Sequence, residues 1–242
     1  MNWLPYLLTF LLLPATVQAD PPRSRSVQEI MAALDKYPVN EVKREAAQKI
    51  LDTPLPEGAS NPELANIHLQ KARAAQELGM AQRRISELRS VIELGGGMSP
   101  SRDWKELSSA EFSAGNLRLA IAAREQAIAL TPKNRTGQLP GDYAALANMY
   151  RQLGEFDKAR QSVRDAENVI QRLRRSPNWD EKHLAWEAEL EDALGRVEFS
   201  TGHYAEAEAR LRRAVGLKEQ DSQRINARTI ESDGNATPEQ AE

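Results

Sequence analysis

The most constraining feature of the sequence is a helical hairpin pattern between residues 142 and 166. Apolar side chains recur there at steps of three and four residues, which is the period of one face of an α-helix. Gly154 interrupts the pattern directly after Leu153, at a position where a left-handed helix end costs glycine less than other residues. We therefore expect two amphipathic helices joined by a tight turn at Gly154.

Small and aromatic residues share the faces on which these two helices would meet. Ala147 and Ala159 would let the helices approach closely, while Tyr150 and Phe156 would fill the outer space. A hairpin with only one apolar face cannot bury that face by itself, so it needs neighbours of the same kind. The pattern therefore predicts a stack of similar hairpins.

The order of residue types resembles the tetratricopeptide repeat, which runs aromatic, Leu, small, aromatic, Gly, aromatic, Ala, apolar, Ala. The match holds at every step over 24 residues, and the matching positions are Tyr143, Leu146, Ala147, Tyr150, Gly154, Phe156, Ala159, Val163 and Ala166. The resemblance implies an all-α protein, an α-solenoid of tetratricopeptide-like helical hairpins. It also implies that the protein holds another protein or a peptide.

Copies of the same layout lie before and after the central hairpin. Their turn glycines, separated by 36, 39 and 48 residues, are Gly79, Gly115, Gly154 and Gly202. The family repeat is about 34 residues long. We interpret the excess as longer connections or longer helices, at residues 95–97, 131–140 and 169–178. We expect a solenoid of about four units over residues 61–218.

Several positions in the outer copies carry polar residues where the repeat has apolar or small ones. These positions are His68, Lys71 and Arg84 in the first copy, Glu111 and Arg124 in the second, and Glu191 and Glu198 in the last. On this basis we interpret the first copy as degenerate. The second and last copies depart from the family pattern only at the positions named.

Residues 20–60 are predicted to form a helical hairpin that lacks the glycine and alanine marks of the repeat. Ser26 and Glu29 form a capping box at the start of its first helix. Asn40 is expected to cap the second helix, whose inward residues are predicted to be Val42, Ala46, Ile50 and Leu51. Terminal units of solenoids are usually atypical, so we interpret this hairpin as an N-terminal cap.

Residues 1–19 are predicted to be a signal peptide. Residues 3–17 carry no charge, and Val17-Gln18-Ala19 resembles the small-x-small cleavage pattern, although no Lys or Arg precedes the apolar run. An uncleaved membrane anchor is the alternative, but a 15-residue helix spans only about 22 Å of a roughly 30 Å hydrocarbon core. Pro5 and Pro14 also interrupt the run. We expect cleavage after Ala19 and export to the periplasm or the secreted space.

Composition narrows the classes of partner. The formal net charge of −3 is too weak to indicate nucleic acid or an acidic surface as a partner. The chain has no cysteine, which excludes disulfides, thiolate catalysis and cysteine metal sites. Residues 219–242 hold six acidic residues and two arginines, and they are predicted to be a disordered acidic tail.

No catalytic or metal site is predicted. The three histidines lie in separate predicted helices without a ligand-spaced partner, at His68, His183 and His203. Glu187, Glu189 and Glu191 are alternate residues of a helix and do not face each other, so a solvated face is favoured over a general acid. A small basic patch lies near a predicted helix end, where cations suit the helix dipole, at Arg172, Arg174 and Arg175.

The resemblance further implies a concave groove, lined by the first helix of each repeat, that holds an extended peptide or a partner helix. The polar residues expected on this face are Asn66, Arg73, Arg102, Lys105, Asn148, Arg151, Gln152 and Arg196. The family often places an asparagine at the position of Asn148 to hydrogen-bond a ligand backbone. Lys105 and Asn148 match the carboxylate-clamp subgroup only in part. Ordinary solvated polarity is the alternative for each of these side chains.

These features together predict a non-catalytic adaptor or scaffold that binds a protein or peptide in the periplasm or secreted space. No cofactor, no nucleic acid and no stable membrane insertion after signal cleavage are expected. One alternative is a regulatory subunit of an envelope enzyme complex whose catalytic domain lies on another chain. A self-associating structural protein is the second alternative.

Overall fold

A computed structural model describes residues 26–34 and 40–234, with side chains described for residues 26–29, 31–32 and 40–227. The chain divides into two units, Met1–Glu41 and Val42–Glu242. In the first, helix α1 (Val27–Leu34) begins with a reciprocal cap, because the Ser26 amide donates to Glu29 Oε2 at 2.9 Å and the Glu29 amide donates to Ser26 Oγ at 3.2 Å. The predicted capping box is confirmed. The predicted signal peptide, residues 1–19, lies outside the described residues.

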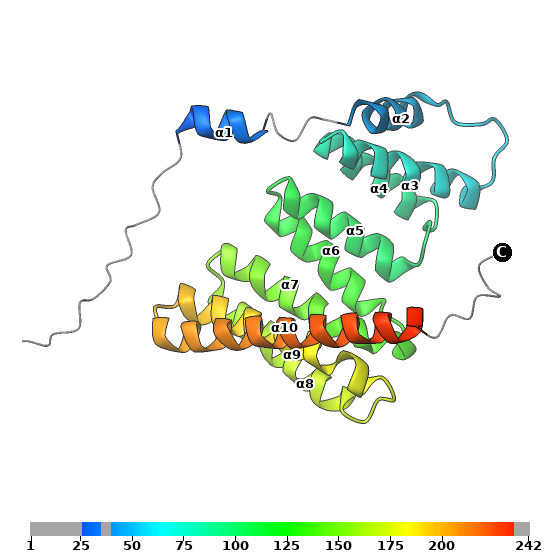
Figure 1. Cartoon of the computed structure of the whole chain (residues 1–242). Coiled ribbons are helices and arrows are strands. Elements are labelled where there is room, and N and C mark those ends of the chain that lie inside the picture. The colour runs from blue at the N-terminus through cyan, green and yellow to red at the C-terminus, as the bar shows by residue number, and fades with distance from the viewer. Residues whose placement is uncertain (1–25, 35–39, 235–242) are drawn as a thin grey trace, which may run out of the picture. The chain divides into compact units, whose positions relative to one another are not determined.

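The described residues of the second unit form helices and no strand (Figure 1). The helices are α2 (Glu41–Asp52), α3 (Asn61–Glu77), α4 (Ala81–Glu93), α5 (Pro100–Ser113), α6 (Leu117–Ala129), the 3-10 helix η1 (Lys133–Gln138), α7 (Leu139–Gln152), α8 (Phe156–Leu173), α9 (Trp179–Ser200) and α10 (Tyr204–Gly234). Contacts pair α3 with α4, α5 with α6, α7 with α8 and α9 with α10, and each hairpin also contacts the next. The predicted all-α solenoid of helical hairpins is confirmed.

The four predicted turn glycines all have positive φ, and Gly154 shows why the turn needs this residue. Its φ is 74°, a left-handed conformation that side chains with a Cβ disfavour. The Gly154 amide donates to the Arg151 carbonyl at 3.0 Å, and the Glu155 amide donates to the Tyr150 carbonyl at 2.9 Å. These bonds satisfy the last carbonyls of α7, so α8 can begin directly after the turn.

The alanines predicted to lie at close helix contacts are fully buried. Ala147 on α7 and Ala159 on α8 are both 0% exposed. Ala147 and Ala159 belong to one apolar cluster that also contains Leu146 and Val163. Small side chains at these points allow the helices to approach while larger side chains fill the space around them.

Buried charges occupy some of the positions where the family repeat has apolar or small residues. Glu111, 1% exposed, accepts a hydrogen bond from Arg89 Nη2 at 2.7 Å and another from Asn116 Nδ2 at 2.7 Å. Arg124 donates to Asp142 Oδ1 at 2.9 Å and to Ser108 Oγ at 3.2 Å. Burial of a charge is tolerated when it is paired and hydrogen-bonded, so these positions join helices by ion pairs.

Glu191 corrects the prediction of a solvated acidic face on α9. The residue is 6% exposed, and its carboxylate lies 3.0 Å from Arg210 Nη1 and 3.4 Å from Arg213 Nε. Both arginines belong to α10, which covers this side of α9. The prediction included a second helix after Gly202 but did not take into account that this helix covers Glu191.

Lys71 attaches α2 to the first hairpin. Its ammonium group donates to the backbone carbonyls of Leu51 at 3.0 Å and Thr53 at 2.5 Å, at the end of α2. Cations stabilise helix C-termini, whose carbonyls lack partners within the helix. The inward residues of α2 are Ala47 and Leu51, which form an apolar cluster with Ala74, Ala75 and Leu78.

The predicted inward face of α2 is therefore partly wrong. Val42 is 78% exposed and Ile50 is 40% exposed, and Ala46 is also exposed, whereas Leu51 is buried as predicted. The predicted N-terminal hairpin corresponds to α1 and α2. Helix α1 belongs to the first unit, whereas α2 belongs to the second unit apart from its first residue, Glu41.

The predicted disordered tail is wrong for residues 219–234, because α10 continues through them. These residues include two Glu, two Gln and two Arg, which favour helix, and Gly234 is the first glycine or proline after Gly216. Arg224 donates to the backbone carbonyls of Asp180 and Glu181, which holds this part of α10 against the start of α9. Residues 235–242 lie outside the described part. Among the helices described, none is both long and apolar enough to cross a membrane.

Candidate binding groove

A cavity of about 370 Å³ opens between α7, α9 and α10. Small residues on α7, namely Gly141, Ala144 and Ala145, lie one helical turn apart or adjacent and leave room along this face. The polar side chains that line the cavity are Asn148 and Arg151 of α7, Glu189, Asp192 and Arg196 of α9, and Lys218 of α10. We call this set of lining residues the α7–α9 groove.

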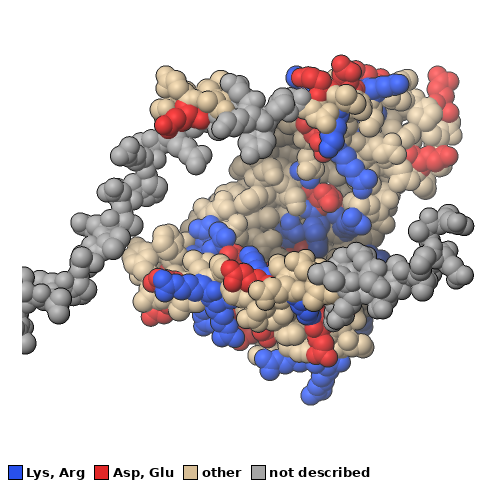
Figure 2. Space-filling model, in the orientation of Figure 1, with Lys and Arg blue, Asp and Glu red and all other residues tan. Residues whose placement is uncertain are grey.

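Figure 2 shows a hollowed face of the molecule in which Lys and Arg side chains lie beside Asp and Glu side chains. The α7–α9 groove has the same mixed character, since Arg151, Arg196 and Lys218 lie with Glu189 and Asp192. A mixed groove of this kind suits a polar peptide better than a uniformly charged polymer.

Arg151 is held in place by neutral partners. Its Nη2 and Nε atoms donate to Asn148 Oδ1 at 2.8 and 3.3 Å, and its Nη1 atom donates to Ser200 Oγ at 3.0 Å. No carboxylate of the described residues forms an ion pair with Arg151. The guanidinium is therefore oriented by α7 and α9 while its charge stays available to a partner.

Asn148 keeps its hydrogen-bond donors available. The side-chain oxygen accepts from Arg151, which fixes the orientation of the amide. The amide nitrogen donates to no side chain or backbone atom in the described part of the structure. An asparagine amide carries two N–H donors, so both remain available beside the cavity that Asn148 lines.

Arg196 differs from Arg151 because its charge is already paired. Its Nε atom donates to Asp192 Oδ2 at 2.6 Å and its Nη2 atom donates to Asp192 Oδ1 at 3.1 Å. The hydrogen bond from Asp192 raises the pKa of Arg196 above its ordinary value. Arg196 therefore contributes shape and hydrogen bonding to the groove more than free positive charge.

Lys105 has a structural role at one end of the groove. Its ammonium group lies 2.8 Å from Asp142 Oδ1, the same oxygen that receives Arg124 Nη1 at 2.9 Å. Asp142 is 2% exposed, and its second carboxylate oxygen is buried without a hydrogen-bond partner. Lys105 thus helps to neutralise a buried carboxylate, and it is absent from the lining of the cavity.

Glu189 adds a perturbed carboxyl group to the groove. Desolvation raises its pKa, and the nearby negative charge of Asp142 raises it further, while Lys218 and Lys105 lower it. The carboxylate also lies close to Gly141, since a Cβ added there would be 2.9 Å from Glu189 Oε2. A larger residue at position 141 would therefore displace this carboxylate.

The structure brings three of the eight predicted groove residues into one cavity, namely Asn148, Arg151 and Arg196. Lys105 lies at the edge in an ion pair, and the others are exposed outside the cavity: Asn66, Arg73, Arg102 and Gln152. The sequence reasoning missed Glu189 and Lys218. Lys218 follows Ala214 of the last copy by four residues, which is about one helical turn. This spacing could have predicted which side of the helix Lys218 occupies.

No group of three or more His, Asp or Glu side chains in the described ranges is arranged to hold a metal ion. The sequence gives no significant match to any curated protein. Residues 143–169 match the tetratricopeptide repeat family, and this segment covers all but the first residues of α7 and most of α8. The central hairpin therefore contains a tetratricopeptide repeat.

Solved structures with the same fold cover most of this chain. One holds nearly identical TPR-like repeats of a putative kinesin light chain from Podosopora anserina, with 20% identity, a TM-score of 0.59, and coverage of 81% of this chain and 96% of that chain. Another is MamA, with 18% identity, a TM-score of 0.50, and coverage of 83% of this chain and 99% of that chain. The tetratricopeptide-repeat fold typically serves as a non-catalytic scaffold for protein partners.

Proposed function

We propose that this protein is a non-catalytic adaptor that binds an extended segment of a protein partner in the α7–α9 groove. The observation that carries the proposal is the arrangement of Asn148, Arg151 and Lys218. An amide with free donors lies in one cavity with two cations that form no ion pair among the described residues.

Each side chain has a defined part in this binding. The Asn148 amide donates to a backbone carbonyl of the segment, since an extended segment leaves alternate backbone groups without partners. Arg151, which also donates to Ser200, donates paired hydrogen bonds to a carboxylate of the partner. Lys218 adds positive charge from α10, and Ala144 leaves space for the segment to approach.

The experiment compares capture of a partner by the whole protein and by two charge-matched variants. The protein serves as bait in its native compartment, and captured proteins are identified by mass spectrometry. Asn148→Ala combined with Lys218→Glu removes one donor and reverses one charge in the groove. Lys182→Glu makes the same charge change on α9 at an exposed position outside the cavity.

We expect the groove variant to lose the captured partner while the Lys182→Glu control retains it. Both variants are expected to melt like the wild type, because surface changes usually alter stability by less than about 0.5 kcal/mol. Equal capture by both variants would locate the binding surface elsewhere. Recovery of an enzyme as the retained partner would favour the regulatory-subunit alternative, and a second copy of the chain would favour self-association.

We also propose that the protein is exported to the periplasm or secreted space. The support is the uncharged run of residues 3–17 followed by Val17-Gln18-Ala19. Mass spectrometry of the protein from its native host is expected to show Asp20 at the N-terminus. An intact Met1 on membrane-bound protein would contradict the proposal.

A further inference from the structure

A second groove lies on the opposite face of α7 from the α7–α9 groove. Two cavities of about 710 Å³ and about 330 Å³ adjoin there, because Tyr143 and Asp165 line both of them. The smaller cavity also has Leu146 and Tyr150 of α7 in its wall. Successive residues of a helix are rotated by about 100°, which places positions 143, 146 and 150 roughly opposite positions 141, 145 and 148. We call the two adjoining cavities the α6–α8 groove.

The larger cavity carries unpaired positive charge. Arg172 and Arg175 line it, both are exposed, and neither forms an ion pair with a described carboxylate. Arg172 lies in the last turn of α8, and Arg175 follows two residues after the helix ends at Leu173, so both lie at the C-terminal end of α8. Some other arginines of the chain are paired, as Arg160 is with Asp157 at 3.1 Å and Arg212 is with Glu208 at 2.5 Å.

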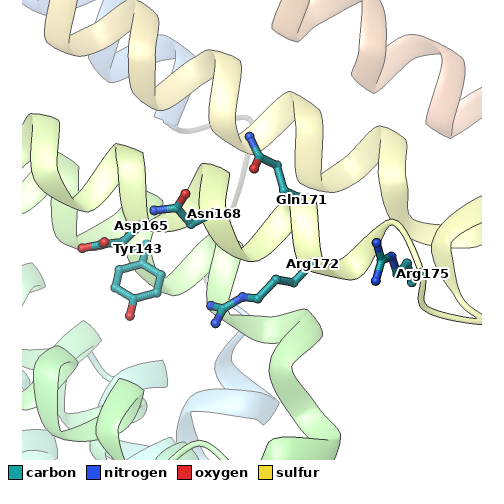
Figure 3. Close-up of a pocket in the computed structure, with 6 residues that line it drawn as sticks. All are labelled: Tyr143, Asp165, Asn168, Gln171, Arg172 and Arg175. Carbon is teal, nitrogen blue, oxygen red and sulfur yellow. The ribbon is translucent and has the colours of Figure 1, made fainter.

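Polar groups surround these arginines. Asn168 and Gln171 line the same cavity, and Figure 3 shows the Tyr143 ring and the Arg172 side chain extending toward the same open space. Burial raises the pKa of Tyr143, so its hydroxyl stays protonated and can donate a hydrogen bond. The large cavity thus offers donors and cations, whereas Asp165 at its junction with the small cavity is the only acidic residue in its lining.

The smaller cavity is more apolar. Ile128 of α6 and Leu146 and Tyr150 of α7 contribute to its walls, and Lys158 of α8 lies over the Tyr150 ring at 5.3 Å from its centroid. The Tyr150 hydroxyl donates to Glu125 Oε1 at 2.6 Å, and both residues line this cavity. An apolar side chain of a partner would bury its surface here against α6 and α7.

We propose that the α6–α8 groove binds an acidic peptide segment of a protein partner, separate from the segment bound in the α7–α9 groove. An apolar side chain of the segment occupies the small cavity, and two Asp or Glu side chains pair with Arg172 and Arg175. From Lys158 to its end at Leu173, α8 rises by about 22 Å, which an extended chain covers with about seven residues, and Arg175 lies two residues beyond. The segment therefore lies along α8 with its apolar end near Lys158.

Charge complementarity favours a peptide over nucleic acid in this groove. Two arginines give a short cationic stretch, and Asp165 would repel a continuous phosphate backbone where the cavities join. Binding of single-stranded nucleic acid usually depends on a longer basic track with several stacking aromatic rings. A carboxylate instead pairs with one guanidinium in a bidentate geometry, which suits the separate cations of this groove.

The test uses a phage-displayed library of random linear peptides as the probe and the full chain as the target. Selected peptides are synthesised with a fluorescent label and titrated by fluorescence anisotropy. Arg172→Glu with Arg175→Glu reverses the charge of the groove. Arg160→Glu with Arg164→Glu makes the same charge change on α8 outside both cavities.

We expect the enriched peptides to carry two acidic residues and one apolar residue within about eight positions. Their affinity is expected to fall at least about tenfold in the Arg172→Glu, Arg175→Glu variant and less than about threefold in the control variant. Asn148→Ala with Lys218→Glu is expected to leave the affinity unchanged, which separates this groove from the proposed adaptor site.

Several outcomes would overturn the proposal. Enrichment of neutral or basic peptides would do so, as would equal affinity of the two arginine variants. A single-stranded RNA oligonucleotide or vesicles with anionic phospholipid serve as competing probes. If either binds and is lost in the Arg172→Glu, Arg175→Glu variant while no acidic peptide is selected, the groove serves another class of partner. Circular dichroism of each variant confirms that loss of binding does not reflect loss of the helical fold.

Discussion

At the scale of single residues, the protein replaces parts of the apolar core of its repeats with ion pairs. Arg124 is 7% exposed and contacts a carboxylate from the following hairpin, and Glu111 is 1% exposed and contacts Arg89 from the preceding hairpin. Such pairs add little when compared with well-packed apolar residues, but breaking one partner alone is costly. The charged residues at these degenerate repeat positions are therefore tolerated only together with their particular ion-pair partners.

Arg124→Leu is expected to lower the free energy of unfolding by about 3 kcal/mol, because it leaves Asp142 buried with Lys105 as its only cation. Asp142→Asn in the same chain removes the uncompensated charge and is expected to recover part of the loss. Urea unfolding of the single and double variants measures both values. A single variant as stable as the wild type would show that Lys105 alone compensates Asp142.

Glu189 makes the stability depend on pH in a predictable direction. Its folded pKa is raised above the ordinary value of 4.5, so the folded state binds more protons than the unfolded state between the two pKa values. This group therefore reduces stability as pH rises through that interval, and the penalty is absent below the unfolded pKa. Glu189→Gln is expected to stabilise the protein at neutral pH and to lose this advantage below about pH 4.

Thermal melting of Glu189→Gln and wild type across this pH range measures the difference. Glu187→Gln on the same helix is the control, since no shift in its pKa is resolved and it does not line the cavity. If the stability difference between Glu189→Gln and the wild type does not change with pH, the raised pKa of Glu189 in the folded state is contradicted.

At the scale of helices, the sequence predicted the positions of the turns better than it predicted which helix faces are buried. Positive φ requires glycine, so Gly154 and its counterparts could be located from residue identity alone. The helical period also placed Asn148 and Arg151 on one side of α7. The inward face of α2 depends on how it meets α3, and Ala46 and Ala47 are not distinguished by residue type.

The missed features of the candidate groove arise from contacts between distant segments. Lys218 reaches the cavity because α10 lies along α9, which a local pattern does not specify. Glu191 is buried for the same reason. The acidic composition after Lys218 suggested disorder, but the helix propensity of its Glu, Gln and Arg residues and the contacts of Arg224 extend α10.

Ala159→Leu tests the close contact of α7 and α8. Ala159 is 0% exposed, so a larger side chain would force the helices apart at an expected cost of about 1–3 kcal/mol. Ala205→Leu makes the same change at an exposed position of α10 and is expected to leave the melting temperature nearly unchanged. If both variants melt like the wild type, the contact between α7 and α8 is looser than the structure shows.

At the scale of the whole molecule, cohesion of the second unit depends on contacts between neighbouring hairpins. Trp186 of α9 forms one apolar cluster with Val169, Ile170 and Leu173 of α8, and its indole Nε1 donates to the Gly137 carbonyl at 2.9 Å. This one side chain therefore connects the last two hairpins and η1. In solenoids, stability is approximately a sum of repeat and nearest-neighbour terms.

Trp186→Ala is expected to cost about 3–5 kcal/mol and to act mainly on the last two hairpins. Hydrogen exchange is expected to accelerate in α8, α9 and α10 and to remain close to wild type in α3 and α4, which have no direct contact with this cluster. A uniform acceleration across all described helices would show that the second unit unfolds as one cooperative body.

The position of α7 between two lined surfaces has a consequence for reactions between partners. A helix with its side chains is about 10–12 Å in diameter, so two segments bound on its opposite faces would be kept about that far apart. Linking two molecules over such a distance gives an effective concentration on the order of millimolar. Two partner proteins that rarely collide when dilute would then lie next to each other. The rate of a reaction between them would depend on occupancy of both sides of α7 rather than on diffusion.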